Sequence, residues 1–350
     1  MWQVAGQDKA VSILQRSLER GKLAHAYLVV GPPHVGKMTL ALNIAQALNC
    51  ESAEPPCGQC PSCQKVADGN HADVQIVGLI QNEDAAEAKL ISIDQVRDVQ
   101  HSASLPPFEG RYKAFIVEDA ELLSIEAANC LLKTLEEPAD KMVFLLLTTN
   151  EKFLPETVIS RCQRLELTPL PPPQMEEALQ KRWGVEPNRA KLLARLSKGC
   201  LGWAITAAAS DQVLPARAQK LENLYAIIRA DTEERFNKAA QLAARYAQDR
   251  SAVQEILDLW LDWWRDLLLV KIGCQDYVTN TDQLNILHDM AGHYTLEQVR
   301  GCLGSIRAAE VQLKQNANPR LVLEVLMLDT PGGKAINHGD LAMGVKAING

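Results

Sequence analysis

The sequence has no long hydrophobic run, few aromatic residues and no excess of positive charge, and each absence excludes a class of protein. Its longest apolar runs, such as residues 142–147, are far shorter than the ~20 residues of a membrane-spanning helix. Aromatic residues make up 5%, and 43 Asp and Glu outnumber 36 Lys and Arg, for a net charge of −7. A surface that coats DNA or an anionic membrane is therefore excluded, although a local basic patch is not.

We also expect no secretory leader, because the first ten residues, MWQVAGQDKA, have neither a basic start nor an apolar core. We therefore expect a cytoplasmic protein that makes no contact with membranes, in a compartment where disulfides are rare. The 350 residues suffice for two or three domains. An apolar share of 47% is ordinary for globular proteins and rules out wholesale disorder.

Apolar patterns in the first half alternate between short buried runs and helical stripes. The runs typical of buried parallel strands are residues 26–30, 74–77, 115–117 and 143–147. The segments with helical spacing are residues 11–18, 40–48, 93–99 and 126–135. This alternation predicts an α/β domain with a parallel sheet over residues 1–168.

Four prolines within residues 169–173 interrupt this pattern, since they can continue neither a helix nor a central strand. We place a domain boundary there and predict a small helical lid over residues 169–210. Helical periodicity continues over residues 211–330, where Trp260 and Trp264 share one apolar face, so we predict an all-helical domain with these rings in its core. Residues 331–350 are glycine-rich and predict a flexible tail.

The segment GPPHVGKMT follows the first predicted strand and begins a helix. In this setting GxxxxGK is typical of loops that bind nucleotide phosphates: Gly31 and Gly36 let backbone amides point inward, and Lys37 reaches the outer phosphates. Next stands Met38 instead of the Ser or Thr that ligates Mg²⁺, and Thr39 is rotated away by about 100° of helix. The loop predicts binding of ATP or ADP and leaves Mg²⁺ open; a plain glycine turn is the alternative.

Two carboxylates follow the predicted strand at residues 115–117. In ATPases with such a loop, an apolar strand ends in Asp-Glu; the first acid lies near Mg²⁺ and the second orients the attacking water. Here the order is reversed, Glu118 then Asp119, so the base is one methylene short. We interpret the pair as a weakened catalytic site; two solvated acids at a strand end are the alternative.

Four of the nine cysteines lie within fourteen residues: Cys50, Cys57, Cys60 and Cys63. Four thiolates this close, with glycine and proline between them, predict a tetrahedral structural zinc site that folds this insertion. An iron–sulfur cluster and a pair of disulfides are the alternatives, and the compartment disfavours the second.

Several short sequence stretches, taken together, are typical of one protein family. They are VAGQ at residues 4–7, HAYL at 25–28, the four cysteines, LLKTLEEP at 131–138, TTN at 148–150, SRC at 160–162 and, more weakly, NPRL at 318–321. Together they span residues 1–330, and the chain resembles the clamp-loader subunits of bacterial DNA polymerase III, delta-prime and the related gamma/tau, which belong to the AAA+ superfamily.

This resemblance implies a nucleotide-binding domain, a lid and a helical collar that holds a five-subunit ring, with each ATP site between subunits. It implies that Arg161, of the SRC stretch, reaches a neighbour's site as an arginine finger; an ordinary surface arginine is the alternative. It also implies that Thr149 senses the γ-phosphate and that Val4 lines the nucleotide site. The implied partners are gamma/tau and delta, with the sliding clamp and primed DNA reached through the complex.

Departures from the gamma/tau pattern favour a delta-prime-type subunit. Gamma/tau subunits carry a lid arginine, and the matching residues 199–203, GCLGW, contain none. The Mg²⁺ ligand and the acid pair are altered as well, while Arg161 is retained. We therefore expect a stator-like subunit with weak or no ATPase activity of its own that assists a neighbour's hydrolysis. A gamma/tau-type motor is the main alternative, and an AAA+ protein of recombination or repair is a more distant one.

Overall fold

The computed structural model describes residues 2–79 and 90–332, which form two compact units. The first comprises Met1–Gly184 and Gly199–Ile205, and the second comprises Val185–Lys198 and the chain from Thr206 on. The stretch predicted as a lid, residues 169–210, is therefore shared between the two units. The predicted tail lies outside the described residues from position 333 onward.

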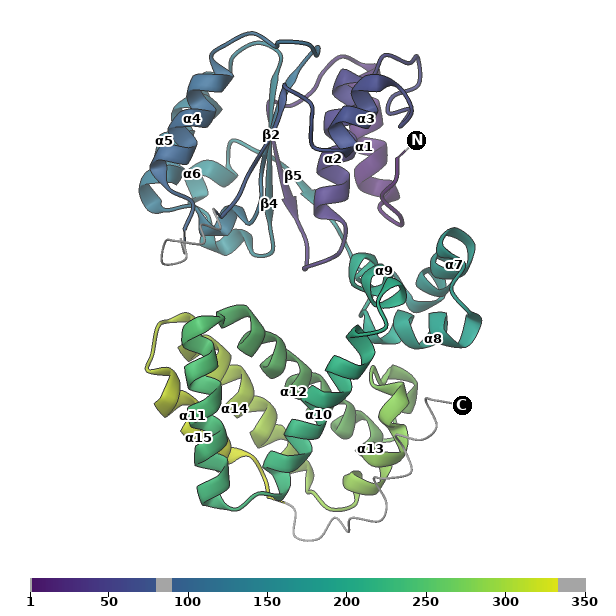
Figure 1. The fold of residues 1–350 in the computed structure, drawn as a ribbon, viewed down its shortest axis with the longest axis vertical. Helices are drawn as coiled ribbons and strands as arrows, with labels where there is room; N and C mark the ends of the chain where they lie inside the picture. Colours follow the sequence, from purple (N-terminus) through teal and green to yellow (C-terminus); the bar gives the residue numbers. More distant parts are fainter. Residues whose placement is uncertain (1, 80–89, 333–350) are drawn as a thin grey trace. The chain divides into compact units, whose positions relative to one another are not determined.

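A five-stranded parallel sheet forms the centre of the first unit (Figure 1). The strands are β1 (Ala26–Val30), β2 (Val74–Val77), β3 (Lys113–Val117), β4 (Met142–Thr148) and β5 (Gln163–Glu166). Their order is β2-β3-β4-β1-β5, and β3 and β4 are buried along their whole length. Such double-faced burial is what continuous Val, Ile, Leu and Phe runs predict in a parallel sheet.

Helices cover both faces of this sheet (Figure 1). On one face lie α1 (Asp8–Glu19), α2 (Lys37–Asn49) and α3 (Pro61–Ala67), and on the other lie α4 (Ile93–Ala103), α5 (Ile125–Glu136) and α6 (Glu156–Ile159). Leu40 and Ile44 of α2 belong to one apolar core, while Val96 of α4 and Leu131 of α5 belong to the second. The predicted α/β fold class is confirmed.

Two elements differ from what the sequence patterns predict. Strand β5 was not predicted, because only Leu165 of its four residues is buried and the others are polar and exposed. Helix α7 (Pro172–Trp183) begins inside the proline run, with proline in its first turn. Proline is tolerated there because the missing N–H would have had no partner within the helix.

The second unit is built from helices alone in the residues that the structure describes. They are α8 (Pro187–Leu196), α10 (Val213–Arg229), α11 (Thr232–Gln248), α12 (Arg250–Lys271), α13 (Leu284–Ala291), α14 (Leu296–Lys314) and α15 (Pro319–Asp329), with short turns η3 (Gln275–Tyr277) and η4 (Thr281–Gln283). Trp260 and Trp264 of α12 are buried in its core, as predicted, and so is Trp263, whose Nε1 donates to Tyr225 Oη at 3.1 Å.

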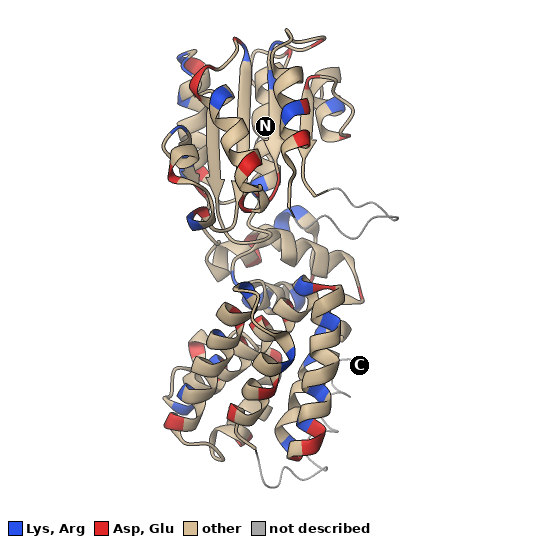
Figure 2. Ribbon diagram, turned by 90° about the vertical axis from the view of Figure 1, so that its left-hand side faces the viewer, with Lys and Arg blue, Asp and Glu red and all other residues tan. Residues whose placement is uncertain are grey.

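Among the described residues, no helix has the length and apolar character needed to cross a membrane. Lys and Arg are interspersed with Asp and Glu along the helices, and the side of the molecule drawn in Figure 2 has no broad face of one sign among those residues. This mixture agrees with the small net charge of −7.

Candidate nucleotide and metal sites

Three of the predicted site segments meet at the carboxyl edge of the sheet. The phosphate loop leaves β1 after Val30, Glu118 and Asp119 follow β3, and Thr149 follows β4. Val30 pairs with Thr148, so the ends of β1 and β4 are level. This edge is where α/β proteins bind ligands, since loops and helix N-termini converge there.

The phosphate loop is folded around its own lysine. Gly36 has φ +107°, which favours glycine, and α2 begins at the next residue, Lys37. Lys37 Nζ donates to the carbonyl oxygens of Gly31 at 2.7 Å and Pro32 at 3.0 Å. Burial lowers the pKa of Lys37, and nearby Glu121 and Asp119 partly oppose that shift. Two of the three N–H donors of the ammonium that would meet phosphate are thus already bonded to the chain.

The start of α9 (Leu201–Ala209) lies directly against this loop. Gly202 N donates to His34 O at 2.8 Å, and a Cβ on Gly202 would lie 2.8 Å from the same oxygen. Only glycine allows so close an approach without displacing the loop. Residues 199–203 match the stretch expected to carry a lid arginine in gamma/tau subunits. In this chain the same stretch makes the backbone contact of Gly202 with His34 instead.

The two predicted acids are placed differently. Glu118 is exposed, and a Cβ added at Gly78 would lie 3.6 Å from its Oε2. Asp119, also exposed and with φ +47°, lies near Lys37, and partial desolvation followed by the charge of Glu121 raises the pKa of its carboxyl. The carboxylates that act electrostatically on the loop lysine are therefore Asp119 and Glu121.

Sequence reasoning missed Glu121, which is drawn to the site by the single turn η1 (Ala120–Leu122). Its Oε1 accepts hydrogen bonds from both the backbone N–H of Thr149, at 3.0 Å, and the Thr149 hydroxyl. Burial opposes ionisation of Glu121, but hydrogen bonds from Thr149 and Thr148 outweigh it and lower the pKa. The residue predicted to sense a γ-phosphate is thus bound to a carboxylate of its own chain.

The remaining predicted nucleotide residues surround the beginning of α2. Met38 is half-buried and packs on the apolar core of that face of the sheet, and Thr39 is half-buried one position further. Val4 packs on the same core, and its Cγ2 lies 3.4 Å from the place where a Cβ on Gly36 would stand. The structure thus places Val4 beside the loop, whereas Met38 packs against the apolar core.

Arg161 lies at the opposite, amino edge of the sheet. It precedes β5, whose first residue Gln163 pairs with Tyr27, whereas the loop leaves β1 after Val30. The residues between Tyr27 and Val30 span roughly 10 Å of strand, and Arg161 begins further back still. Arg161 is therefore remote from the phosphate loop of its own chain.

A local framework holds the Arg161 side chain at the surface. Its Nη2 lies 2.6 Å from Glu136 Oε1, at the end of α5, and its Nη1 donates to Thr157 O at 2.8 Å. The side chains of Arg161 and Glu136 are 34% and 51% exposed, so the guanidinium is fixed in direction yet open to a partner molecule. In solution such an exposed pair adds little to stability.

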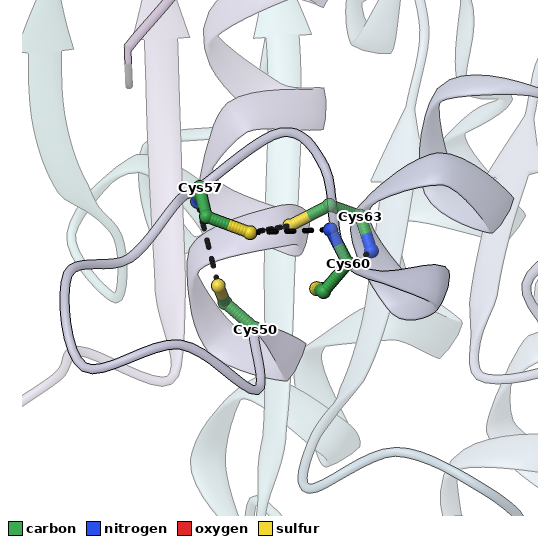
Figure 3. A group of neighbouring side chains, drawn as sticks. All are labelled: Cys50, Cys57, Cys60 and Cys63. Atoms are coloured by element: carbon green, nitrogen blue, oxygen red, sulfur yellow. Dashed lines mark hydrogen bonds between the residues drawn. The ribbon is translucent and has the colours of Figure 1, made fainter.

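The four clustered cysteines converge between the end of α2 and the start of α3 (Figure 3). Their Sγ atoms lie within 4.8 Å of one another, and those of Cys57 and Cys63 are 3.9 Å apart. A zinc ion with four Zn–S bonds of ~2.3 Å requires sulfurs about 3.8 Å apart. The four are free thiols, and Cys50 and Cys63 are buried.

Backbone amides point at these sulfurs, as they do around metal-bound thiolates. Cys57 N donates to Cys50 Sγ at 3.4 Å, and Cys60 N donates to Cys57 Sγ at 3.3 Å. Amides of Gln59 and Cys60 lower the pKa of the Cys57 thiol to about 6, whereas burial raises that of Cys63 to about 12. Four thiolates can coexist here only if a cation offsets their charge, so this group, the cysteine knuckle, fits a structural zinc ion.

Two family models and a relative of known name match most of this chain. Residues 6–171 match the family model described as "DNA polymerase III, delta subunit", and residues 215–330 match "DNA polymerase III, delta subunit, C terminal". The delta-prime subunit of Bacillus subtilis is 29% identical over 323 residues, which cover 92% of this chain and 95% of that protein. The chain belongs to the DNA polymerase III delta-prime family. The resemblance drawn from the motifs is confirmed.

Relatives of the gamma/tau type match a shorter part. The tau subunit of Escherichia coli is 35% identical over 205 residues, 57% of this chain and 31% of that protein. Among solved structures, a gamma subunit-related protein from Thermotoga maritima aligns with a TM-score of 0.48 at 17% identity, covering 92% of this chain and 98% of that one. The first unit is a parallel five-stranded α/β domain carrying the cysteine knuckle, and the described part of the region that follows it is all-helical.

Proposed function

We propose that this chain acts in a DNA polymerase III clamp loader by donating Arg161 to the ATP site of a neighbouring subunit, while its own loop hydrolyses ATP little or not at all. The observation that carries the proposal is the position of Arg161: partly exposed, oriented by Glu136 and at the sheet edge remote from its own loop. A guanidinium in that place can serve a site on another chain and stabilise charge on a transferring phosphoryl group.

The phosphate-loop geometry supports the second half of the proposal. Lys37 and Thr149, the groups that would meet the outer phosphates, already have partners in Gly31, Pro32 and Glu121. A nucleotide must displace these contacts before it binds, and Met38 offers Mg²⁺ no hydroxyl. The chain is therefore proposed to bind ATP or ADP weakly.

Family membership supplies the proposed partners. They are gamma/tau and delta subunits in a hetero-pentamer, with the sliding clamp and primed DNA engaged through the complex. Residues 169–210 serve as the lid and 211–330 as the collar in this proposal, and a zinc ion bound by the cysteine knuckle has a structural role.

Reconstituted clamp loader tests the role of Arg161. We expect the Arg161→Ala variant to lower ATP turnover by at least about tenfold, and toward ~10³-fold if this site limits the cycle. Arg164→Ala is the matched control, because Arg164 is also exposed and paired with carboxylates, Glu151 and Glu166. Both variants should assemble normally by gel filtration. Turnover with Arg161→Ala within twofold of wild type would refute the proposal.

The second candidate is a gamma/tau-type motor, favoured by one observation, the intact Gly36-Lys37 pair at the start of α2. It requires Lys37 to leave the carbonyls of Gly31 and Pro32 and Mg²⁺ to be held without a hydroxyl at position 38. Loading of the clamp that stays undiminished in a Lys37→Ala variant would exclude this candidate.

A further inference from the structure

Helix α2 carries a row of buried amide side chains where a core helix normally has apolar ones. Asn43, Gln46 and Asn49 recur at every third position and are 1%, 3% and 3% exposed. Burying an amide is unfavourable unless its donors and acceptors are all matched. Such a row therefore indicates specific polar contacts that apolar packing could not provide.

The first two amides link two distant segments of the chain. Gln46 Nε2 donates to the carbonyl oxygen of Cys63 at 2.9 Å, and Asn43 Nδ2 donates to Gln46 Oε1 at 3.0 Å. Asn43 Oδ1 in turn accepts from Gln3 N at 2.7 Å and Val4 N at 3.3 Å. Each donor meets an acceptor, so both amide orientations are fixed, and a continuous path runs from the cysteine knuckle to the N-terminal segment.

Both ends of this path adjoin a candidate ligand site. Cys63 is fully buried and supplies one of the four clustered sulfurs. At the other end, Val4 packs beside Gly36, the residue immediately before Lys37. The path therefore spans α2 from its metal-binding end to its phosphate-loop end.

We propose that Asn43 and Gln46 are positioning residues that make the placement of Gln3 and Val4 at the phosphate loop depend on zinc in the cysteine knuckle. A bound cation fixes Cys63 and hence the carbonyl that Gln46 holds. When the cation leaves, the four sulfurs separate and that carbonyl moves. Because Asn43 and Gln46 are 1% and 3% exposed, bulk water has little access to replace the lost bond, and the hydrogen bonds of Asn43 to the two backbone amides weaken in turn.

Hydrogen exchange of the Gln3 and Val4 amides in the full-length chain, with zinc bound and after chelation, tests this coupling. In wild type we expect exchange to accelerate at least about fivefold when zinc is removed, the scale of one lost hydrogen bond. The amide of Phe144, which donates to His25 O at 2.8 Å within the sheet, reports global opening and should change less.

Variants of nearly unchanged volume separate the path from general stability. Gln46→Met should exchange fast at Gln3 and Val4 even with zinc bound and show no further response to chelation. Gln100→Met is the matched control, because Gln100 also donates to a cysteine carbonyl, Cys130 O at 2.7 Å, but from α4 on the other face of the sheet. It should keep the zinc response of wild type.

Several results would overturn the coupling. These are exchange at Gln3 and Val4 that ignores zinc, equal acceleration at Phe144, or a full zinc response in Gln46→Met. If that variant does not fold, the wild-type comparison with and without zinc decides alone. Failure to find zinc in protein purified without chelators would overturn both this inference and the zinc assignment, while leaving the Arg161 proposal standing.

Discussion

The two candidate ligand sites lie at the two ends of helix α2. They differ in whether the chain itself supplies partners for the groups that would bind the ligand. At its beginning, Lys37 Nζ donates to the carbonyl oxygens of Gly31 and Pro32, so the loop itself supplies acceptors for the lysine. At its end, the cysteine knuckle gathers four thiols, and two of them have pKa values shifted in opposite directions, to about 6 for Cys57 and about 12 for Cys63. The second site needs a cation to become satisfied, and the first needs none.

This difference makes zinc at the cysteine knuckle a structural ligand and nucleotide at the phosphate loop an optional one. Opening the phosphate loop costs two hydrogen bonds of Lys37 and the contact of Thr149 with Glu121, about 3 kcal/mol at ~1 kcal/mol each. That is a factor of roughly 100 in affinity. Zinc at the cysteine knuckle meets no such competition from the chain and contributes its binding energy to folding.

The largest expected effect is at the cysteine knuckle. Cys63→Ala should remove the zinc, about one ion per chain by metal analysis, and lower the free energy of unfolding by at least about 3 kcal/mol. Cys274→Ala, which changes a half-buried cysteine of the second unit, should keep both zinc and stability. A wild-type protein equally stable with and without chelator would break the comparison.

A smaller effect is expected at the phosphate loop. Glu121→Ala frees Thr149 and removes a negative charge beside Lys37, so affinity for ATP should rise about tenfold, the value of ~1.4 kcal/mol. Isothermal titration calorimetry measures it. Glu126→Ala removes the same charge from the exposed first turn of α5 and should have no such effect. Unchanged affinity in Glu121→Ala would mean that the internal contacts do not limit binding.

The smallest effect concerns a carboxylate in the second unit, Glu310, whose ionised form is disfavoured. Burial and then Asp258 raise the pKa of Glu310 to about 7. The folded state then binds more protons than the unfolded state between about pH 4.5 and 7, so stability falls as pH rises through this window.

Glu310→Gln should remove that slope and stabilise the protein at pH 8 by up to about 1 kcal/mol, discounted for partial solvent exposure. Urea unfolding at pH 5 and pH 8 measures both terms. Glu297→Gln, at the exposed start of the same helix, should keep the wild-type slope. A wild-type slope in Glu310→Gln would assign the pH dependence to other groups.

Sequence patterns sufficed where chemistry depends on spacing and failed where it depends on tertiary contact. The cysteine knuckle and the GxxxxGK loop were predictable because their ligands lie close together in the chain. Glu121 was not, since it reaches Thr149 only through the turn η1. Strand β5 was missed because one buried residue, Leu165, gives no periodic signal. Asn43 and Gln46 resemble surface residues until their buried partners are seen.

The predicted roles of Arg161, Thr149 and the loop residues stay predictions for a similar reason. Their placement follows from the sheet, but an arginine finger acts on a neighbouring chain. In the proposed assembly, the Arg161–Glu136 pair marks the side of the sheet that would face that neighbour.

Equilibrium binding of Mg²⁺·ATP to the zinc-loaded chain by itself tests the central contrast most directly. The account predicts a dissociation constant roughly 100-fold weaker than that of a gamma/tau subunit measured in the same way, and no measurable turnover. A dissociation constant equal to that of the gamma/tau subunit, accompanied by hydrolysis, would contradict it and make the chain a motor of the gamma/tau type.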